Sequence, residues 1–151
     1  MIISNSSCLI IFDKLGILDL LEKIYGEITI PRTVRDEVFA SQIVPNWIEV
    51  IDVTQPVAYR ILEKTLGPGE SEAIALSLES NPDLLILDDL TARKIAQRLG
   101  IKITGVIGIL LEAKRIGLIT EIKKLLDEIL KLDFRISKAI YDEALRLAKE
   151  K

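Results

Sequence analysis

The chain has 151 residues, a net charge of −3, 49% hydrophobic residues and 28% charged residues. This length suits one domain with a substantial core. The composition excludes both a disordered chain and a membrane-spanning chain, because the apolar runs are too short to cross a bilayer. The sequence holds no histidine and one cysteine, which excludes a Ser-His-Asp triad, a disulfide framework and a cysteine zinc site. Any chemistry must therefore come from carboxylates, lysine, hydroxyl groups or a bound cofactor.

The composition also bears on where the protein works and on what it binds. Residues 1–7 have neither the basic start nor the apolar stretch of a secretory signal, so we expect a cytoplasmic protein. The net charge of −3 argues against constitutive, non-specific binding of nucleic acid. Three Asn and three Gln beside many Ile, Leu, Glu and Lys are typical of a thermophilic source. Cys8 lies in an apolar run, which favours a buried and inert thiol.

Short apolar runs alternate with amphipathic stretches along the whole chain, a pattern typical of a parallel sheet covered by helices. We expect strands over residues 1–4, 27–30, 47–53, 84–87 and 101–104. We expect helices over residues 6–15, 17–25, 32–41, 56–66, 70–80, 90–99, 106–116, 119–132 and 137–149. The prediction is an α/β protein with three α/β/α layers around a central parallel sheet of about four to five strands.

Local signals mark several of the expected helix ends. Ser6 or Ser7 is the expected cap of the first helix, Pro31 the expected first residue of the third, and Ser137 the expected cap of the last. No linker, repeat or low-complexity stretch interrupts the chain, so we expect one domain over residues 1–151. The helices over residues 119–149 would pack on this domain or serve dimerisation.

Polar residues directly follow two of the expected strands. Ligands of parallel α/β proteins bind beyond the carboxyl ends of the strands, so these residues are candidates for a site. Asn5 follows the first strand, where capping of the next helix explains it about as well as a function does. Asp88 and Asp89 follow the strand over residues 84–87, and capping of the next helix is a sufficient explanation for Asp89 taken alone.

Helical spacing selects further acidic residues. Glu37 shares a stripe with Val34 and is therefore expected to face the sheet. Glu70 opens a helix and shares its inward face with Ile74, whereas Glu72 lies closer to the solvent boundary. A glutamate in a first helical turn is ordinarily a partner of the helix dipole, but one that faces inward at the sheet edge has fewer simple explanations.

One amide and several carboxylates are thus expected at a single edge of the sheet, and the motifs contain no cation to offset them. Such a cluster would repel itself unless a divalent cation neutralised it. Hard oxygen ligands suit Mg²⁺ or Mn²⁺, and ions of this type serve phosphodiester cleavage. The candidate metal ligands are Asn5, Glu37, Glu70, Asp88 and Asp89.

A basic stretch follows the aspartates. Arg93, Lys94 and Arg98 lie on the expected helix after Asp89 and could meet the phosphates of an RNA. A solvated helix face explains the same three residues more simply.

The order of these motifs resembles the PIN-domain superfamily, and its DUF3368 branch most closely. The resemblance covers nearly the whole chain, and the combination of motifs is more specific than any one of them. The motifs are Ile2-Ile3-Ser4-Asn5-Ser6-Ser7, Ile30-Pro31, Asp36-Glu37-Val38, Gly67-Pro68-Gly69-Glu70-Ser71-Glu72-Ala73-Ile74-Ala75-Leu76, Leu85-Ile86-Leu87-Asp88-Asp89 and, for the branch, Phe134-Arg135-Ile136-Ser137.

The resemblance implies a Mg²⁺- or Mn²⁺-dependent ribonuclease, which in many members is a VapC-like toxin paired with an antitoxin. It also assigns the family's functional positions to residues of this chain. The four acidic positions of the family correspond to Asn5, Glu37, Glu70 and Asp89. Glu72 lies close to Glu70 in the sequence, and Asp88 is next to Asp89. The small hydroxyl residue of the family corresponds to Ser6 or Ser7. The family usually has aspartate where this chain has Asn5, and an amide brings no charge and cannot act as a base.

Three functions remain open at this point. The first is a metal-dependent endoribonuclease, with RNA as substrate, an antitoxin as possible partner and a homodimer as the expected assembly. The second is a catalytically weak module that binds RNA or a protein, which Asn5 favours. The third is a phosphatase or phosphotransfer domain, for which the first strand would have to offer an aspartate rather than Asn5. An apolar stripe of Ile140, Ala144 and Ala148 on the last helix is more often core or a homodimer face than a partner groove.

Overall fold

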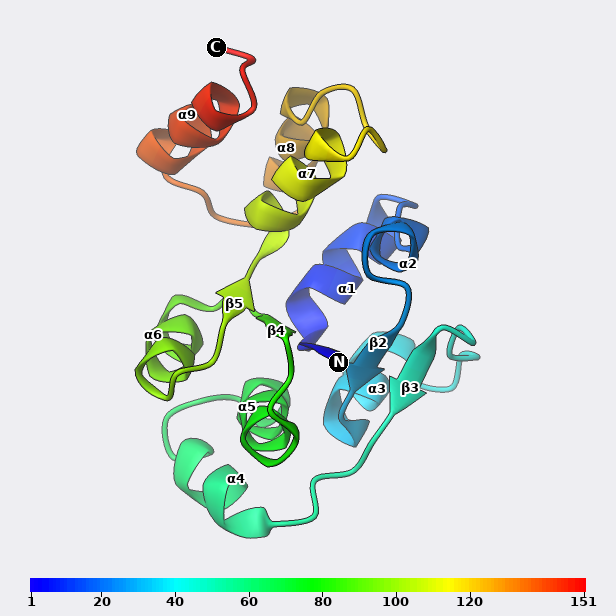
Figure 1. Ribbon diagram of the computed structural model, residues 1–151, viewed down its shortest axis with the longest axis vertical. Helices are drawn as coiled ribbons and strands as arrows, with labels where there is room; N and C mark the ends of the chain where they lie inside the picture. Colours follow the sequence, from blue (N-terminus) through cyan, green and yellow to red (C-terminus); the bar gives the residue numbers. More distant parts are fainter.

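The computed structural model describes residues 1–151 and shows a sheet of five parallel strands in the order β3-β2-β1-β4-β5 (Figure 1). The strands are β1 (Ile2–Ser4), β2 (Ile28–Ile30), β3 (Ile48–Val50), β4 (Leu84–Ile86) and β5 (Ile103–Thr104). The chain begins in the centre of the sheet, builds outward through β2 and β3, and then returns to place β4 on the other side of β1. The strand order therefore reverses between β1 and β4, the position at which such sheets bind ligands.

Nine helices connect and cover the strands (Figure 1). They are α1 (Ser6–Lys14), α2 (Asp19–Tyr25), α3 (Arg32–Phe39), α4 (Pro56–Leu62), α5 (Pro68–Ser80), α6 (Leu90–Arg98), α7 (Val106–Arg115), α8 (Lys123–Leu130) and α9 (Lys138–Leu147). All the expected strands and helices are present, which confirms the predicted three-layer α/β/α fold. None of the helices combines the length and the hydropathy that spanning a bilayer requires.

Two hydrophobic cores lie on the two faces of the sheet. Successive side chains of a strand point to opposite faces, so Ile3 and Leu85 enter the smaller core with α4, α5 and α6. Ile30 and Ile86 enter the larger core with α1, α2 and α7. Ala144 and its neighbours on α9 also belong to the larger core. Of the apolar stripe on the last helix, Ala144 and Ala148 are thus buried within the chain, whereas Ile140 is exposed.

Helices α2 and α8 begin later than expected, at Asp19 and Lys123, and three other helices differ from expectation in their cap or first residue. Pro31 is the N-cap of α3, with ψ of 167°, and not its first helical residue. Its carbonyl accepts the first helical hydrogen bond, from Arg35 N–H at 3.1 Å, as an N-cap residue does. Asn5 is the N-cap of α1, so neither Ser6 nor Ser7 caps that helix. The third difference is α5, which begins at Pro68 because proline suits a first helical position.

The expected cap of the last helix is confirmed. Ser137 Oγ accepts a hydrogen bond from Ile140 N–H at 3.2 Å, and Ser137 has the extended backbone of an N-cap. The helix over residues 119–132 is shorter than expected, since α8 begins only at Lys123.

Candidate functional site

Asn5 lies at the carboxyl end of the central strand. Its backbone N–H donates to Ile86 O at 3.0 Å, which extends the pairing of β1 with β4 by one step. The residue is 2% exposed, and its side-chain Oδ1 has no hydrogen-bond partner. A buried carbonyl oxygen without a partner costs about 1–3 kcal/mol. The folded chain would therefore be stabilised by a cation or a donor group bound at this atom.

The next residue, Ser6, connects α1 to α3. Ser6 Oγ donates a hydrogen bond to Glu37 Oε1 at 3.1 Å. Glu37 is exposed, so the expectation that it faces the sheet is wrong. The helical stripe with Val34 is real, but α3 packs against α1 and α5 at the margin of the sheet. The Glu37 side of α3 consequently meets the first residues of those helices rather than the strands.

Two carboxylates lie against the turn that opens α5. A Cβ at Gly69 would overlap Glu37 Oε1 and lie 3.2 Å from Ser6 Oγ. A Cβ at Gly67 would lie 2.6 Å from Glu70 Oε2. Neither glycine has a positive φ, so what distinguishes them is the close approach of flexible carboxylate side chains and not the backbone conformation. Glu37 and Glu70 thus approach the same short turn from two helices.

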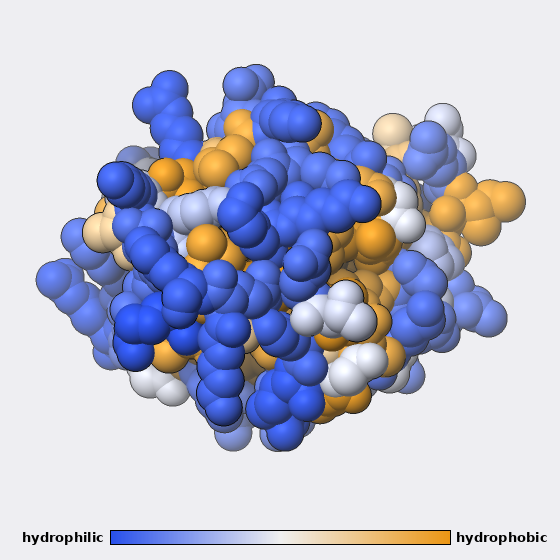
Figure 2. Space-filling model, turned by 90° about the horizontal axis from the view of Figure 1, so that it is seen from above, coloured by the Kyte–Doolittle hydropathy of each residue, from blue (hydrophilic) through white to orange (hydrophobic).

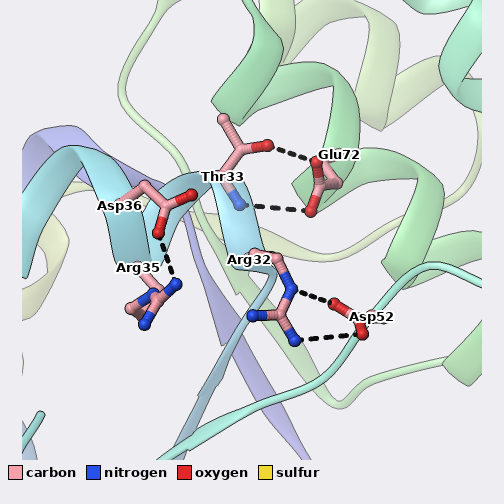
Figure 3. Close-up of polar contacts among 6 residues, drawn as sticks. All are labelled: Arg32, Thr33, Arg35, Asp36, Asp52 and Glu72. Atoms are coloured by element: carbon pink, nitrogen blue, oxygen red, sulfur yellow. Dashed lines mark hydrogen bonds and ion pairs between the residues drawn. The ribbon is translucent and has the colours of Figure 1, made fainter. Parts of the chain in front are cut away.

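Glu72, the second glutamate near the start of α5, has a structural role. Its carboxylate accepts hydrogen bonds from the backbone N–H of Thr33, at 3.2 Å, and from Thr33 Oγ1 (Figure 3). These contacts satisfy the first turn of α3 and attach it to α5. Nearby, Arg32 and Asp52 form a two-pronged ion pair, with Nε–Oδ1 at 2.9 Å and Nη2–Oδ2 at 3.2 Å. The carboxylate of Glu72 is therefore bound to α3, away from the turn that Glu70 contacts.

Asp88 occupies a separate position at the end of β4. Its Oδ1 accepts from Val106 N–H at 3.1 Å, and its Oδ2 accepts from Cys8 Sγ at 2.7 Å. Burial raises the pKa of Asp88, whereas the hydrogen bonds from Cys8 and Val106 oppose that rise. Cys8 is buried, as expected, and burial together with the Asp88 carboxylate raises the pKa of its thiol well above the usual value, which disfavours the reactive thiolate. Asp88 joins β4 to α1 and to the start of α7.

Arg93 lies beside Asp88. A Cβ at Gly105 would overlap Asp88 Oδ1 and lie 2.7 Å from Arg93 Nη1, so the two side chains meet over this glycine. Arg93 Nη1 donates to Leu87 O at 2.9 Å. The expectation that no cation accompanies the acidic motifs is therefore wrong, because Arg93 lies one helical turn after the aspartates and folds back over β4.

The neighbouring aspartate and the other basic residues are exposed. Asp89 Oδ2 accepts from Ala92 N–H at 2.9 Å, so Asp89 is the N-cap of α6, as its position after the strand suggested. Lys94 and Arg98 lie on the same helix with their side chains in solvent. Of the three basic residues singled out on α6, only Arg93 reaches the strand end.

The candidate residues form two groups on either side of α1. One group comprises Ser6, Glu37 and Glu70 at the turn that opens α5, and the other is Asp88 with its neighbours. No set of three or more cysteine, aspartate or glutamate side chains lies close enough to hold a metal ion. The chemistry of the donors still fits a hard cation, because they are all oxygen atoms and Asn5 Oδ1 lacks a partner.

Two features of this edge were not found by reasoning on the sequence. The first is the contact of carboxylates with the turn glycines, for which the Gly67-Pro68-Gly69 motif was the available signal. The second is a pocket of about 630 Å³ beside Asp88. It is lined in part by residues 134–136, a segment that carried the resemblance but no assigned role.

Comparison with known proteins gives one match. The family DUF3368, described as a PIN domain, matches residues 1–150. Neither the curated proteins nor the solved structures contain a match. The family match confirms the resemblance and, with the parallel sheet, a nuclease-type fold.

Proposed function

The chain belongs to the PIN-domain family, and on that premise we propose that it is a ribonuclease dependent on Mg²⁺ or Mn²⁺. The observation that carries the proposal is the unpartnered Oδ1 of Asn5, which is buried at the end of the central strand. It lies one residue before Ser6, whose hydroxyl contacts Glu37. A buried oxygen acceptor, one residue from a hydroxyl group that binds a carboxylate, offers ligands of the type that a hard divalent cation prefers.

In this proposal, Glu37, Glu70 and Asp89 would hold the cation, with Asn5 as a neutral ligand. When bound, such a cation supplies Lewis acidity and neutralises charge at a phosphodiester. Ser6 orients the Glu37 carboxylate through its hydrogen bond. Glu70 and Glu37 need the space that the turn glycines leave.

Asp88 is the weakest of the candidate ligands. Both of its carboxylate oxygens already accept hydrogen bonds, from Val106 N–H and from Cys8 Sγ. We therefore assign it the task of fixing the end of β4, and with it Asp89, relative to α1 and α7. Direct ligation by Asp88 would require these bonds to break.

Cleavage of a single-stranded RNA in the presence of Mn²⁺ tests the proposal. We expect the wild-type protein to cleave, and Asp89→Asn and Glu70→Gln each to lower the rate by about a hundredfold or more, since each removes a charge from the metal site. Glu22→Gln, an exposed glutamate on α2, is the matched control and should cleave as the wild type does. A wild-type protein that cleaves equally well in EDTA would rule the proposal out.

A second function is favoured by two specific observations. Position 5 carries an amide, and no three acidic side chains lie within metal-binding reach of one another. Both would suit a module that binds RNA or a protein and cleaves weakly. The Asn5→Asp variant separates the two functions. If the wild type is inactive and Asn5→Asp cleaves RNA with Mn²⁺, the site is a weakened nuclease site. If the wild type itself cleaves RNA, a module that only binds is excluded.

We also propose that the nuclease acts as the toxin of a toxin–antitoxin pair, as a homodimer and in the cytoplasm, where it would meet RNA. Leu147 of α9, which is 55% exposed, offers an apolar contact for a second copy. Expression in bacteria should arrest growth, and the Asp89→Asn variant should not. Light scattering that gives the mass of a monomer would exclude the homodimer.

A further inference from the structure

A pocket of about 630 Å³ opens at the carboxyl ends of β4 and β5, and residues of α6, α7 and the segment before α9 line it. Its volume lies within the range of about 300–1,000 Å³ that is typical of ligand pockets. Most of its wall is apolar, and its polar groups gather at the strand ends. The lining residues on which the argument depends are Asp88, Arg93, Ile107, Phe134, Arg135 and Ile140.

The polar part of this pocket favours an electron-rich or anionic ligand. The Asp88 carboxylate is already occupied, since it accepts from Val106 N–H and Cys8 Sγ. Arg93 makes one hydrogen bond, from Nη1 to Leu87 O, out of the five N–H donors of a guanidinium. Arg93 is thus the group in the pocket with unused hydrogen-bonding capacity.

The surroundings of the pocket carry a concentration of positive charge. α6, which forms one side, contains Arg93, Lys94 and Arg98 and no acidic residue. Arg135 lines the other side of the pocket and is exposed. Asp88 lines the pocket, and Asp89 and Asp133 adjoin its residues in sequence, so these four cations give a small local excess of positive charge in a chain whose net charge is −3. Such a distribution attracts a polyanion to this end of the sheet.

We infer that this pocket binds a nucleobase of single-stranded RNA beside the bond that is cleaved, an inference that rests on the proposed ribonuclease function. The pocket adjoins Asp88, and Asp89 is the next residue along the chain, so an RNA held at the candidate metal site would pass its mouth. The Phe134 ring and aliphatic side chains provide a surface for a base, while Arg93 and Arg135 can meet base edges or phosphates.

Binding of RNA in EDTA, where no cleavage occurs, tests this inference directly. The probe is a ten-nucleotide single-stranded RNA that carries 2-aminopurine and a fluorescent end label. Phe134 also packs against the larger core, so its truncation would disturb the fold. The better variants are Ile140→Glu and Arg135→Gln, which alter exposed side chains at the pocket. Ile61→Glu, which alters an exposed apolar side chain, and Arg60→Gln, both on α4, are the matched controls.

Both pocket variants should weaken RNA binding by about tenfold and suppress the change in 2-aminopurine fluorescence, since stacking of one base and contact with one cation are each of this size. The two controls should bind within about twofold of the wild type. In the Mn²⁺ cleavage assay, Ile140→Glu should raise KM and leave kcat nearly unchanged. That split is expected of a substrate contact and not of a folding defect.

Several results would overturn the inference. These are an absence of RNA binding by the wild type, equal binding by pocket and control variants, or a pocket that captures an acidic protein partner while RNA binding is unaffected by the variants. The proposed function and the inference fail separately. Cleavage with unchanged binding in the pocket variants refutes the nucleobase site alone, whereas pocket-dependent binding without any Mn²⁺-dependent cleavage refutes the nuclease alone.

Discussion

Gly69 and Gly16 are glycines for different physical reasons. A side chain at position 69 would occupy the space of the Glu37 carboxylate, while the backbone there is ordinary. At position 16 φ is +72°, a left-handed conformation that glycine adopts without strain, and a Cβ would meet nothing within 4 Å. Gly69 therefore leaves space for a side chain of the candidate site, whereas Gly16 allows a backbone conformation on which the stability of the chain depends.

Substitution by alanine should separate these two roles. Gly69→Ala should lower the free energy of unfolding by less than about 1 kcal/mol, because the flexible end of Glu37 can move aside. It should lower Mn²⁺ affinity and cleavage by about tenfold, since the displaced carboxylate is a proposed metal ligand. Gly16→Ala should do the reverse, with a cost of about 1 kcal/mol in stability and unchanged cleavage. Chemical denaturation measures the stability of the two variants, and the cleavage assay measures their activity. If Gly69→Ala cleaved RNA as fast as the wild type does, the role given to Glu37 would be contradicted.

At the scale of elements, one carboxylate attaches the C-terminal helices to each other. Glu150 accepts from the backbone N–H groups of Ile122 at 2.8 Å and Lys123 at 3.0 Å, and from Lys114 Nζ at 2.9 Å. Ile122 is the N-cap of α8 and Lys114 belongs to α7. Burial raises the pKa of Glu150, but these three hydrogen bonds outweigh it and hold the pKa below its usual value. The charged form therefore stabilises the fold.

The pH dependence follows from the sign of this shift. A depressed carboxyl pKa contributes stability that is fully present above the unfolded pKa, about 4.3, and is lost as the pH falls through the folded pKa. Glu150→Gln should therefore lower the free energy of unfolding by about 1–3 kcal/mol near neutral pH. The difference from wild type should vanish in acid. The control is Glu121→Gln, because Glu121 is exposed and lies just before α8 in the sequence. If Glu150→Gln lowered the free energy of unfolding by the same amount at every pH, the role given to the Glu150 charge would be contradicted.

The exposed face of α6 offers a test of RNA contact. Lys94 and Arg98 are four residues apart and point to solvent, so they lie on one face of the helix. If they meet phosphates, Lys94→Gln should weaken RNA binding for every sequence tested and reduce the slope of log K against log salt by about 0.7, the value for one contact with a single strand. Fluorescence anisotropy over a range of salt concentrations measures the slope, and an unchanged slope would identify these residues as a solvated helix face.

Across the whole molecule, the periodicity of the sequence was sufficient to predict the fold. Every strand and helix was placed, because the apolar residues that enter the two cores recur at strand or helix spacing, and glycine, proline or asparagine marks many of the breaks between the elements. Tertiary contacts were harder to predict. The helical stripe that Glu37 shares with Val34 predicted that Glu37 faces the sheet. Because α3 packs against α1 and α5 at the margin of the sheet, Glu37 is instead exposed.

The partners of individual carboxylates could not be predicted either. Asp88 was grouped with the metal ligands because it follows a strand, yet Cys8, from a distant part of the sequence, and Val106 occupy its oxygens. Arg93 reaches the same strand end only because α6 packs back against it. Helical spacing and strand ends indicate which residues lie at an edge, whereas their pairing depends on side-chain packing between elements.

The exposed apolar residues of the molecule are dispersed among polar ones. Seen from the end where the C-terminal helices lie, most of the surface is hydrophilic, and hydrophobic atoms show as patches between charged side chains (Figure 2). Ile140 and Leu147 of α9 remain exposed. Exposed apolar residues that are scattered singly are normal for a monomer, so the proposed homodimer depends on a direct measurement of mass.

The central claim is that the end of β1 at Asn5 is a binding site for a divalent cation, and calorimetric titration with Mn²⁺ tests it most directly. The wild-type protein should bind Mn²⁺ in the millimolar range or tighter, Asn5→Asp should bind about tenfold more tightly because it adds a charge, and Asn5→Leu should lose binding. Circular dichroism on each variant shows whether the fold is retained. A wild-type protein that binds no Mn²⁺, or a folded Asn5→Leu variant that binds it as the wild type does, would contradict the claim.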